Sequence, residues 1–245
     1  MLKPVRKQSL SDAVFTQLRD QIVNGELAPG EALPAERVLC EALGVNRGSV
    51  REGLRRLQQS RLVSIRHGGT SQVLDYRATG GLDLLADLIL PSGGSIDTSV
   101  VRGIIEMRSA LAPDIARRAA ERHSTAHLER LDATVARMRA AGGDLTALQE
   151  LAMSFWSELV DASDNLAYRL AYNSLRATYD QCRALFTRVL ADEIGDVAGY
   201  AAIATAVRGS NAEGAFRRAR TLIERGERGV KQVLDHLADA AEAHA

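Results

Sequence analysis

The sequence contains few aromatic residues and almost no cysteine. Aromatic side chains make up 4% of its 245 residues, whereas hydrophobic residues make up 46%. This balance supplies ample material for a core, and we expect that core to be helical and rich in leucine and alanine rather than built from sheets. Cys40 and Cys182 lie far apart and lack metal-type spacing, so we expect two buried thiols in a reducing, cytoplasmic compartment.

Long apolar runs and a surplus of one charge are also missing. No stretch approaches the roughly 18 consecutive apolar residues of a membrane span, and no apolar signal-peptide core follows the basic N-terminus. The formal net charge of zero hides a division, because residues 1–77 hold twelve Lys and Arg against eight Asp and Glu. The remainder holds nineteen against twenty-three. A basic front favours contact with an anion, although a surplus of this size also fits an ordinary surface.

Residues 1–77 read as three short helices followed by a β-hairpin. Apolar residues recur at helical spacing after a capping pair of Ser9 and Asp12, and Gly44 ends the second helix. Asn46 is a good N-cap for the third helix. Residues 62–74 then alternate as a strand, a glycine turn and a second strand. This order predicts a winged helix-turn-helix as the first domain, residues 1–77.

From residue 78 onward the pattern is helical. No convincing strand is found, and amphipathic segments are expected at 80–90, 97–123, 124–141, 145–162, 165–191, 195–209 and 211–241. The protein is therefore predicted to be mainly α, with an all-α bundle of about seven helices as its second domain, residues 78–245.

The third helix of the first domain carries a basic face. Arg47 and Arg51 are four residues apart and therefore project from one side of it, opposite its apolar row. The second helix of a helix-turn-helix enters the major groove with its N-terminus, where arginine binds guanine and short polar residues bind phosphate. A solvated basic helix is the alternative, but the order of helix, turn, capped basic helix and wing favours DNA. The residues predicted to contact DNA are Arg37, Asn46, Arg47, Gly48, Ser49, Arg51 and, at the hairpin tip, His67, Gly68 and Gly69.

The segment "LPAERVLCEALGVNRGSVREGLRRLQQSRLVSIRHGGTSQV" resembles the winged-helix domain of the GntR family of transcriptional regulators. The resemblance implies DNA contacts at Arg37, Arg47, Ser49, Arg51, His67 and Gly68. Asn46 replaces the usual Ser or Thr, and Gly69 stands where DNA-contacting relatives can carry lysine. We expect a homodimer, because two winged helices related by a two-fold axis read a palindromic operator.

The helical part is similar to the FadR subfamily of these regulators, through "EMRSALAPDIARRAAERH" and "SFWSELVDASDN". Many members hold a divalent metal with one Asp and three His, and D-x-x-F-H marks the first of these ligands. Here Ala152 and Trp156 stand in place of that Asp and His, so no metal is expected.

The metal-free branch of the subfamily binds long-chain acyl-CoA, and several segments resemble it. "DNLAYRLAYNSLRATYDQ" keeps its spacing of Asn and Tyr, and Arg108 falls on an arginine of its effector cavity. "IERGERGVK" partly matches its ligand segment, through Glu224, Gly226 and Glu227, whereas Thr221, Leu222 and Gly229 replace neighbouring residues of that branch. The resemblance implies that a long-chain acyl-CoA controls the affinity for DNA.

A stripe of apolar and aromatic residues runs along segment 165–191. Its members recur at spacings of four and three: Tyr168, Tyr172, Leu175, Tyr179, Cys182, Phe186 and Val189. Core packing explains such a stripe, but buried hydroxyl groups need partners, and three tyrosines near Phe155 and Trp156 also suit a small-molecule pocket. The predicted effector site comprises Arg108, Phe155, Trp156, Tyr168, Tyr172, Tyr179, Glu224 and Gly226.

There are three alternatives to a regulator that responds to acyl-CoA. The sequence holds no P-loop, no G-x-S-x-G and no H-E-x-x-H, so we do not expect an enzyme. A regulator of the same family that responds to a small carboxylate is a second possibility. A third is a helical domain that only dimerises, with a packed interior around Trp156 and Tyr172.

Overall fold

A computed structural model describes residues 9–65, 71–89 and 96–242, and divides the chain into two compact units, Met1–Asp97 and Thr98–Ala245. The first unit extends beyond residue 77 because Leu84 joins its hydrophobic core. In addition, Asp87 pairs with the buried Arg19 at an N–O distance of 2.5 Å. The segment after the hairpin therefore packs with the first unit.

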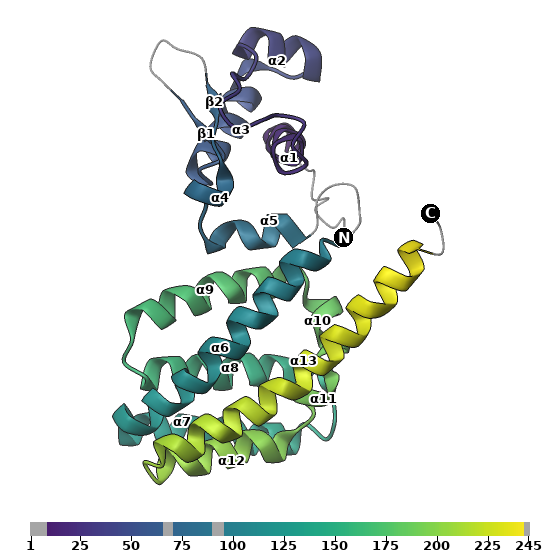
Figure 1. Ribbon diagram of the computed structural model, residues 1–245. Coiled ribbons are helices and arrows are strands. Elements are labelled where there is room, and N and C mark those ends of the chain that lie inside the picture. The colour runs from purple at the N-terminus through teal and green to yellow at the C-terminus, as the bar shows by residue number, and fades with distance from the viewer. Residues whose placement is uncertain (1–8, 66–70, 90–95, 243–245) are drawn as a thin grey trace, which may run out of the picture. The chain divides into compact units, whose positions relative to one another are not determined.

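The first unit consists of short helices and one small sheet (Figure 1). Its elements are α1 (Leu10–Val23), α2 (Glu36–Leu43), α3 (Arg47–Gln59), β1 (Val63–Ser64), β2 (Gln72–Val73), α4 (Tyr76–Thr79), η1 (Leu82–Leu84) and α5 (Leu85–Ile89). The strands pair antiparallel, with Val63 opposite Val73. The predicted winged helix-turn-helix is confirmed.

Local sequence signals account for how α3 is held. The capping box of Ser9 and Asp12 begins α1, as predicted. Gly44 ends α2 at φ +63°, a left-handed conformation that glycine adopts without strain. Arg56 ties α3 to α1, because its guanidinium lies 4.2 Å from the centre of the Phe15 ring and pairs with Asp12. The apolar side of α3, with Val50, Leu54 and Leu57, is buried, whereas Arg47 and Arg51 on its other side are exposed.

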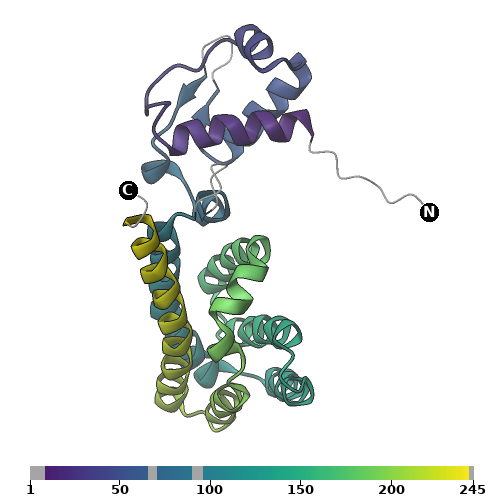
Figure 2. The same cartoon turned by 90° about the vertical axis from the view of Figure 1, so that its right-hand side faces the viewer.

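The second unit is a bundle of helices (Figure 2). Its elements are α6 (Thr98–Arg122), α7 (Thr125–Ala140), α8 (Leu145–Ala162), α9 (Leu166–Gln181), α10 (Arg183–Val189), α11 (Ala191–Ile194), α12 (Val197–Arg208) and α13 (Ala212–Glu242). The two long helices α6 and α13 pack along each other, and α8 is buried on much of its surface, with Phe155 and Leu159 fully enclosed. Among the described residues, no helix is long and apolar enough to cross a membrane.

The expectation of one helix over 165–191 is wrong. The backbone N–H of Cys182 donates to the carbonyl oxygen of Tyr179, only three residues back, at 3.1 Å. This tighter turn ends α9 and lets α10 start in a new direction. As a result the rings of Tyr179 and Phe186 stack with their centres 5.1 Å apart, although seven residues of straight helix would separate their backbones by about 10.5 Å.

Candidate functional site

The N-terminal part of α3 presents two exposed arginines on one side. The side chains of Arg47 and Arg51 are 70% and 56% exposed. Asn46 caps the helix, because its Oδ1 accepts the backbone N–H of Ser49 at 2.9 Å. A Cβ at Gly48 would lie 3.2 Å from that oxygen, so glycine keeps the cap uncrowded. The helix start is thus fixed, while its cationic side chains remain accessible.

Glu36, in the first turn of α2, contacts both arginines. It accepts the Nε–H of Arg47 at 2.8 Å and that of Arg51 at 3.1 Å. The hydrogen bond from Arg47 is the main reason why the pKa of Glu36 lies below its usual value, and the pKa of Arg47 is raised in turn. Glu36 was not predicted as a site residue, because the prediction considered only cationic and short polar side chains. Its place directly before Arg37 in the quoted motif is the signal that could have identified it.

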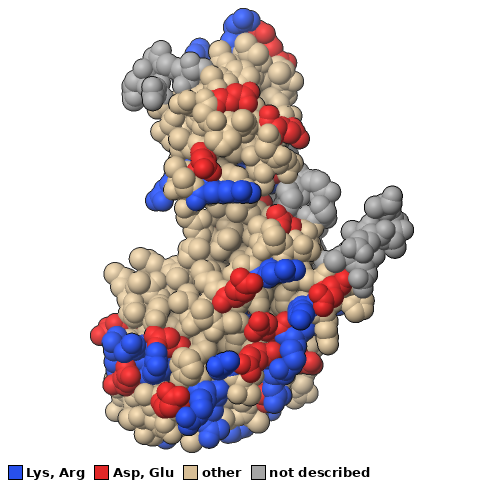
Figure 3. Space-filling model, in the orientation of Figure 1, with Lys and Arg blue, Asp and Glu red and all other residues tan. Residues whose placement is uncertain are grey.

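Of the other predicted DNA contacts in this unit, the structure describes Arg37 but not the hairpin tip. Arg37 lies on α2, pairs with Glu41 at 2.5 Å and has a side chain that is 79% exposed. His67, Gly68 and Gly69 lie outside the described residues. By contrast, the face of the second unit that Figure 3 shows carries Lys, Arg, Asp and Glu side chains interspersed, without an expanse of one sign. On the face shown, no expanse of positive charge comparable to the arginine pair of α3 is visible on the second unit.

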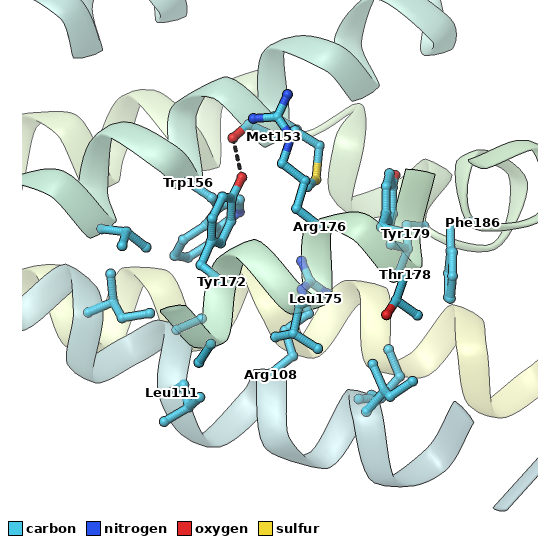
Figure 4. Close-up of a pocket in the computed structure, with 18 of the residues that line it drawn as sticks. Arg108, Leu111, Met153, Trp156, Tyr172, Leu175, Arg176, Thr178, Tyr179 and Phe186 are labelled. Atoms are coloured by element: carbon cyan, nitrogen blue, oxygen red, sulfur yellow. Dashed lines mark hydrogen bonds between the residues drawn. The ribbon is translucent and has the colours of Figure 1, made fainter. Parts of the chain in front are cut away.

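A pocket lies inside the second unit and is lined mainly by apolar and aromatic side chains (Figure 4). The cavity has a volume of about 110 Å³. Its wall includes Ile104, Ile105, Arg108, Leu111, Ala112 and Ile115 from α6, Ala152, Met153, Trp156 and Val160 from α8, and Tyr168, Ala171, Tyr172, Leu175, Arg176, Thr178 and Tyr179 from α9. Phe186, Leu190, Glu193, Ile194 and Tyr200 complete it from the segments that follow. The structure thus brings five of the eight predicted effector residues to one cavity.

The three predicted tyrosines of α9 have hydroxyl partners. Tyr168 donates to Oδ2 of Asp114 at 2.6 Å, and Tyr172 donates to the carbonyl oxygen of Met153 at 2.5 Å. Tyr179 accepts from the buried amide of Gln149. Burial raises the pKa of Tyr172 to about 12. These hydroxyl groups therefore fasten α9 to its neighbours and turn the rings, rather than the oxygens, towards the cavity.

A buried ion pair crosses the pocket wall. Arg108 binds Glu193 with both terminal nitrogens, one of them at 2.9 Å. Burial raises the pKa of Glu193, and Arg108 opposes this rise. Burial also lowers the pKa of Arg108, but the attraction of Glu193 outweighs it and the pKa is raised. Glu193 was not among the predicted site residues, because nothing in its local sequence distinguishes it from a surface glutamate.

Three predicted effector residues do not line the pocket. Phe155 is fully buried behind the wall, where its ring packs edge-on against Tyr200. Glu224 pairs with Arg220 one turn away on α13, at 2.8 Å. Gly226 contacts the pocket only through Glu193: a Cβ at position 226 would lie 2.0 Å from Oε2 of Glu193, so glycine leaves room for that side chain.

Two polar atoms of the wall make no regular hydrogen bond to the described residues, although the indole N–H of Trp156 approaches the hydroxyl group of Tyr200 closely enough to counter part of the pKa rise that burial causes. Both atoms, the indole nitrogen and the hydroxyl oxygen, are buried. Burial raises the pKa of Tyr200 well above its usual value, Glu193 adds to the rise, and Arg108 and Trp156 oppose it. Within the described parts of the chain, no group of three or more His, Cys, Asp or Glu side chains is arranged to hold a metal ion.

Comparison with known proteins agrees with this division into two units. Residues 10–73 match the bacterial regulatory proteins of the gntR family, and residues 103–225 match the FCD domain. The chain is 36% identical over 233 residues to the HTH-type transcriptional regulator Mce2R of Mycobacterium tuberculosis, which covers 95% of this chain and 96% of that protein. It is 30% identical over 175 residues to the fatty acid metabolism regulator protein of Edwardsiella ictaluri, or 71% of each chain.

A solved structure shows the same fold. It is that of Lar, which controls the expression of the Listeria monocytogenes agr system, and it matches with a TM-score of 0.51 at 19% identity, over 93% of this chain and 98% of that one. The two family matches cover residues 10–73 and 103–225, and the relationship to Mce2R spans 95% of the chain. The chain therefore belongs to the GntR family of DNA-binding transcriptional regulators, with the helix-turn-helix in its first unit and an FCD domain in its second.

Proposed function

We propose that this regulator binds a palindromic operator as a homodimer and that a long-chain acyl-CoA in the FCD pocket controls its affinity for DNA. The observation that carries the proposal is the apolar, aromatic-lined cavity between α6, α8 and α9. A relative at 30% identity bears the name fatty acid metabolism regulator protein, which supports a fatty-acyl ligand.

The acyl chain suits the inner wall of the pocket. Each methylene moved from water into an apolar site contributes about 0.8 kcal/mol, or roughly a fourfold gain in affinity. Side chains such as Ile104, Leu111 and Leu175 supply that environment. Arg176 lines the same pocket from an exposed position and offers a cation to the phosphates of coenzyme A.

On the DNA side, the N-terminus of α3 enters the major groove. Arg47 and Arg51 then bind guanine edges, while Arg37, Ser49 and the backbone at Gly48 contact phosphates. Asn46 contributes through its amide nitrogen, because its oxygen already caps the helix. His67, Gly68 and Gly69 at the wing tip contact the minor groove.

The ligand acts only through a difference in affinity between two arrangements of the protein. An acyl-CoA that binds equally to the free and the DNA-bound regulator changes nothing, however tightly it binds. A tenfold weaker operator complex requires a preference of about 1.4 kcal/mol for the released arrangement. In such a mechanism the ligand changes how much of the protein can bind the operator, and α3 makes the same contacts with DNA whenever it does bind.

The proposal is tested by adding oleoyl-CoA to the protein and measuring its melting temperature and its gel shift on an operator selected from random duplexes. Oleoyl-CoA should raise the melting temperature and alter operator binding, whereas coenzyme A alone should do neither. Stabilisation only by a small carboxylate together with zinc would overturn the acyl proposal. Failure of the selection to enrich any duplex would overturn the DNA contacts proposed for α3.

A further inference from the structure

The exposed side of α3 carries a third arginine, Arg55, which is not among the predicted DNA contacts. Arg55 follows Arg51 by four residues, as Arg51 follows Arg47, and four residues of helix turn the direction of a side chain by only about 40°. The three arginines therefore form a row along one side of the helix. Arg55 lies about 12 Å along the axis from Arg47, because each residue adds about 1.5 Å.

The packing of α3 against α1 fixes which side of the helix faces outward. A Cβ at Gly53 would lie 2.7 Å from Cγ1 of Val14 and 3.3 Å from the backbone nitrogen of Phe15, so the two helices approach too closely for a larger residue there. Leu54 and Leu57 are buried in the same hydrophobic core. The helix therefore cannot roll about its axis, and the arginine row keeps its outward direction.

The three arginines differ in how firmly they are held. Glu36 accepts the Nε–H groups of Arg47 and Arg51 at 2.8 and 3.1 Å. Arg55 pairs with Glu52 on the same helix at 3.9 Å, a distance too long for a hydrogen bond. Its side chain is 71% exposed and that of Glu52 is 54% exposed, so water screens the pair. Arg55 can therefore exchange this partner for another anion at little cost.

The length of the arginine row matches the dimensions of duplex DNA. The major groove is about 12 Å wide, and the two phosphate backbones form its rims. A helix that enters the groove with its N-terminus places Arg47 and Arg51 near the base edges. An arginine about 12 Å along the axis from Arg47 has left the floor of the groove and lies at the level of the phosphates. Arginine binds phosphate through charge-assisted hydrogen bonds, often with two nitrogens at once.

We propose that Arg55 binds a phosphate at the rim of the major groove and gives up Glu52 when it does so. The inference rests on the DNA contacts proposed for α3 and adds a contact that carries no sequence information. Glu52 acts as a competitor, because its carboxylate attracts Arg55 whenever no phosphate is bound. Arg55 thus sets how tightly the protein holds any duplex, while Arg47 and Arg51 set which duplex it prefers.

The test measures the affinity of the full-length protein for the selected operator and for a scrambled duplex by fluorescence anisotropy, between about 50 and 200 mM salt. Arg55→Gln should weaken both complexes by the same factor, so that the ratio of the two affinities is unchanged. Each lost phosphate contact reduces the logarithmic salt slope by about 0.9, so per bound subunit the loss should be roughly 3.5-fold greater at the lower salt concentration than at the higher one.

The matched control is Arg139→Gln. It removes the same charge from an exposed position on α7 in the second unit. If the contact of Arg55 is specific, Arg139→Gln should leave the salt slope and both affinities unchanged.

Two further variants separate a phosphate contact from a base contact. Arg55→Lys keeps the charge that a phosphate needs but loses the planar fork that reads guanine, so the salt slope and the ratio of affinities should both stay at their wild-type values. Glu52→Gln removes the competitor, so both affinities should rise by the same factor, about twofold to fivefold.

Three results would overturn the inference. A wild-type salt slope in Arg55→Gln would mean that no phosphate contact was lost, a changed ratio of affinities in Arg55→Lys would mean that Arg55 contacts a base, and unchanged affinities in Glu52→Gln would mean that Glu52 does not compete. In each case Arg51→Ala still weakens operator binding and the proposed function stands. If neither Arg51→Ala nor Arg55→Gln alters binding, the DNA contacts proposed for α3 fail together with the inference.

Discussion

Replacing Glu36 by glutamine should weaken the discrimination between operator and random DNA while leaving the fold intact. The side chains of Arg47 and Arg51 are 70% and 56% exposed, and that of Glu36 is 30% exposed. Exposed ion pairs contribute about 0.2–1 kcal/mol each. Because glutamine can still accept a hydrogen bond, Glu36→Gln should lower the free energy of unfolding by about 1 kcal/mol or less.

The effect on DNA binding is larger because Glu36 orders both arginines before they reach the bases. Immobilising a long side chain costs about 0.5–1.5 kcal/mol, so losing this order for two arginines weakens specific binding by about 1–3 kcal/mol. That is roughly a 5- to 150-fold loss in the ratio of specific to non-specific affinity. Removing a negative charge also favours phosphate contact, and each further neutralised phosphate steepens the salt dependence by about 0.9 in the logarithmic slope.

Fluorescence anisotropy with the selected operator and a scrambled duplex, between about 50 and 200 mM salt, measures both quantities. Glu52→Gln is the matched control. It removes the same charge from α3 itself, but Glu52 pairs with Arg55, at 3.9 Å, and not with Arg47 or Arg51. An unchanged specificity ratio in Glu36→Gln, or an equal loss in Glu52→Gln, would refute the role of Glu36 as an organiser of the two arginines.

Three further predictions concern single side chains. Arg51→Ala should weaken operator binding by about 1–3 kcal/mol in anisotropy titrations, with an unchanged melting temperature for the FCD unit. Gly226→Ala should destabilise the protein by about 1–3 kcal/mol in denaturant titrations, because the new Cβ displaces Glu193. Gly103→Ala is the control: its Cβ meets no atom within 4 Å, so this change should stabilise α6 by up to about 1 kcal/mol. The pKa of Tyr172 is raised to about 12 on folding, so its contribution to stability is present below a pH of about 10 and is lost as the pH rises towards 12. The midpoint pH of alkaline unfolding should therefore be higher in Tyr172→Phe than in the wild type.

The sequence predicts the DNA-reading unit well because its signals are local. The capping box at Ser9, the αL glycine at Gly44 and the Asn46 cap each act within a few residues, and the structure confirms all three. The hairpin follows from strand alternation over a short span. Glu36 was missed because its importance depends on contacts with residues 11 and 15 positions away, across the turn between two helices.

The pocket could be predicted only in part, for the same physical reason. Helical spacing brought Tyr168, Tyr172 and Tyr179 to one side of α9, and they do line the cavity. The break at Cys182 depends on one backbone hydrogen bond that no residue type signals. Tyr200, on a helix beyond that break, reaches the cavity through tertiary packing, which hydrophobic periodicity does not encode.

The most direct test of the account is the operator affinity of the wild type and of Ala171→Phe, each with and without oleoyl-CoA. Ala171 lines the pocket, so a phenylalanine there fills space that the acyl chain would occupy. We predict that both proteins bind the operator equally well without ligand, and that oleoyl-CoA changes the affinity of the wild type at least tenfold while leaving Ala171→Phe unaffected. Equal responses of the two proteins, or no response in the wild type, would contradict control of DNA binding from this pocket.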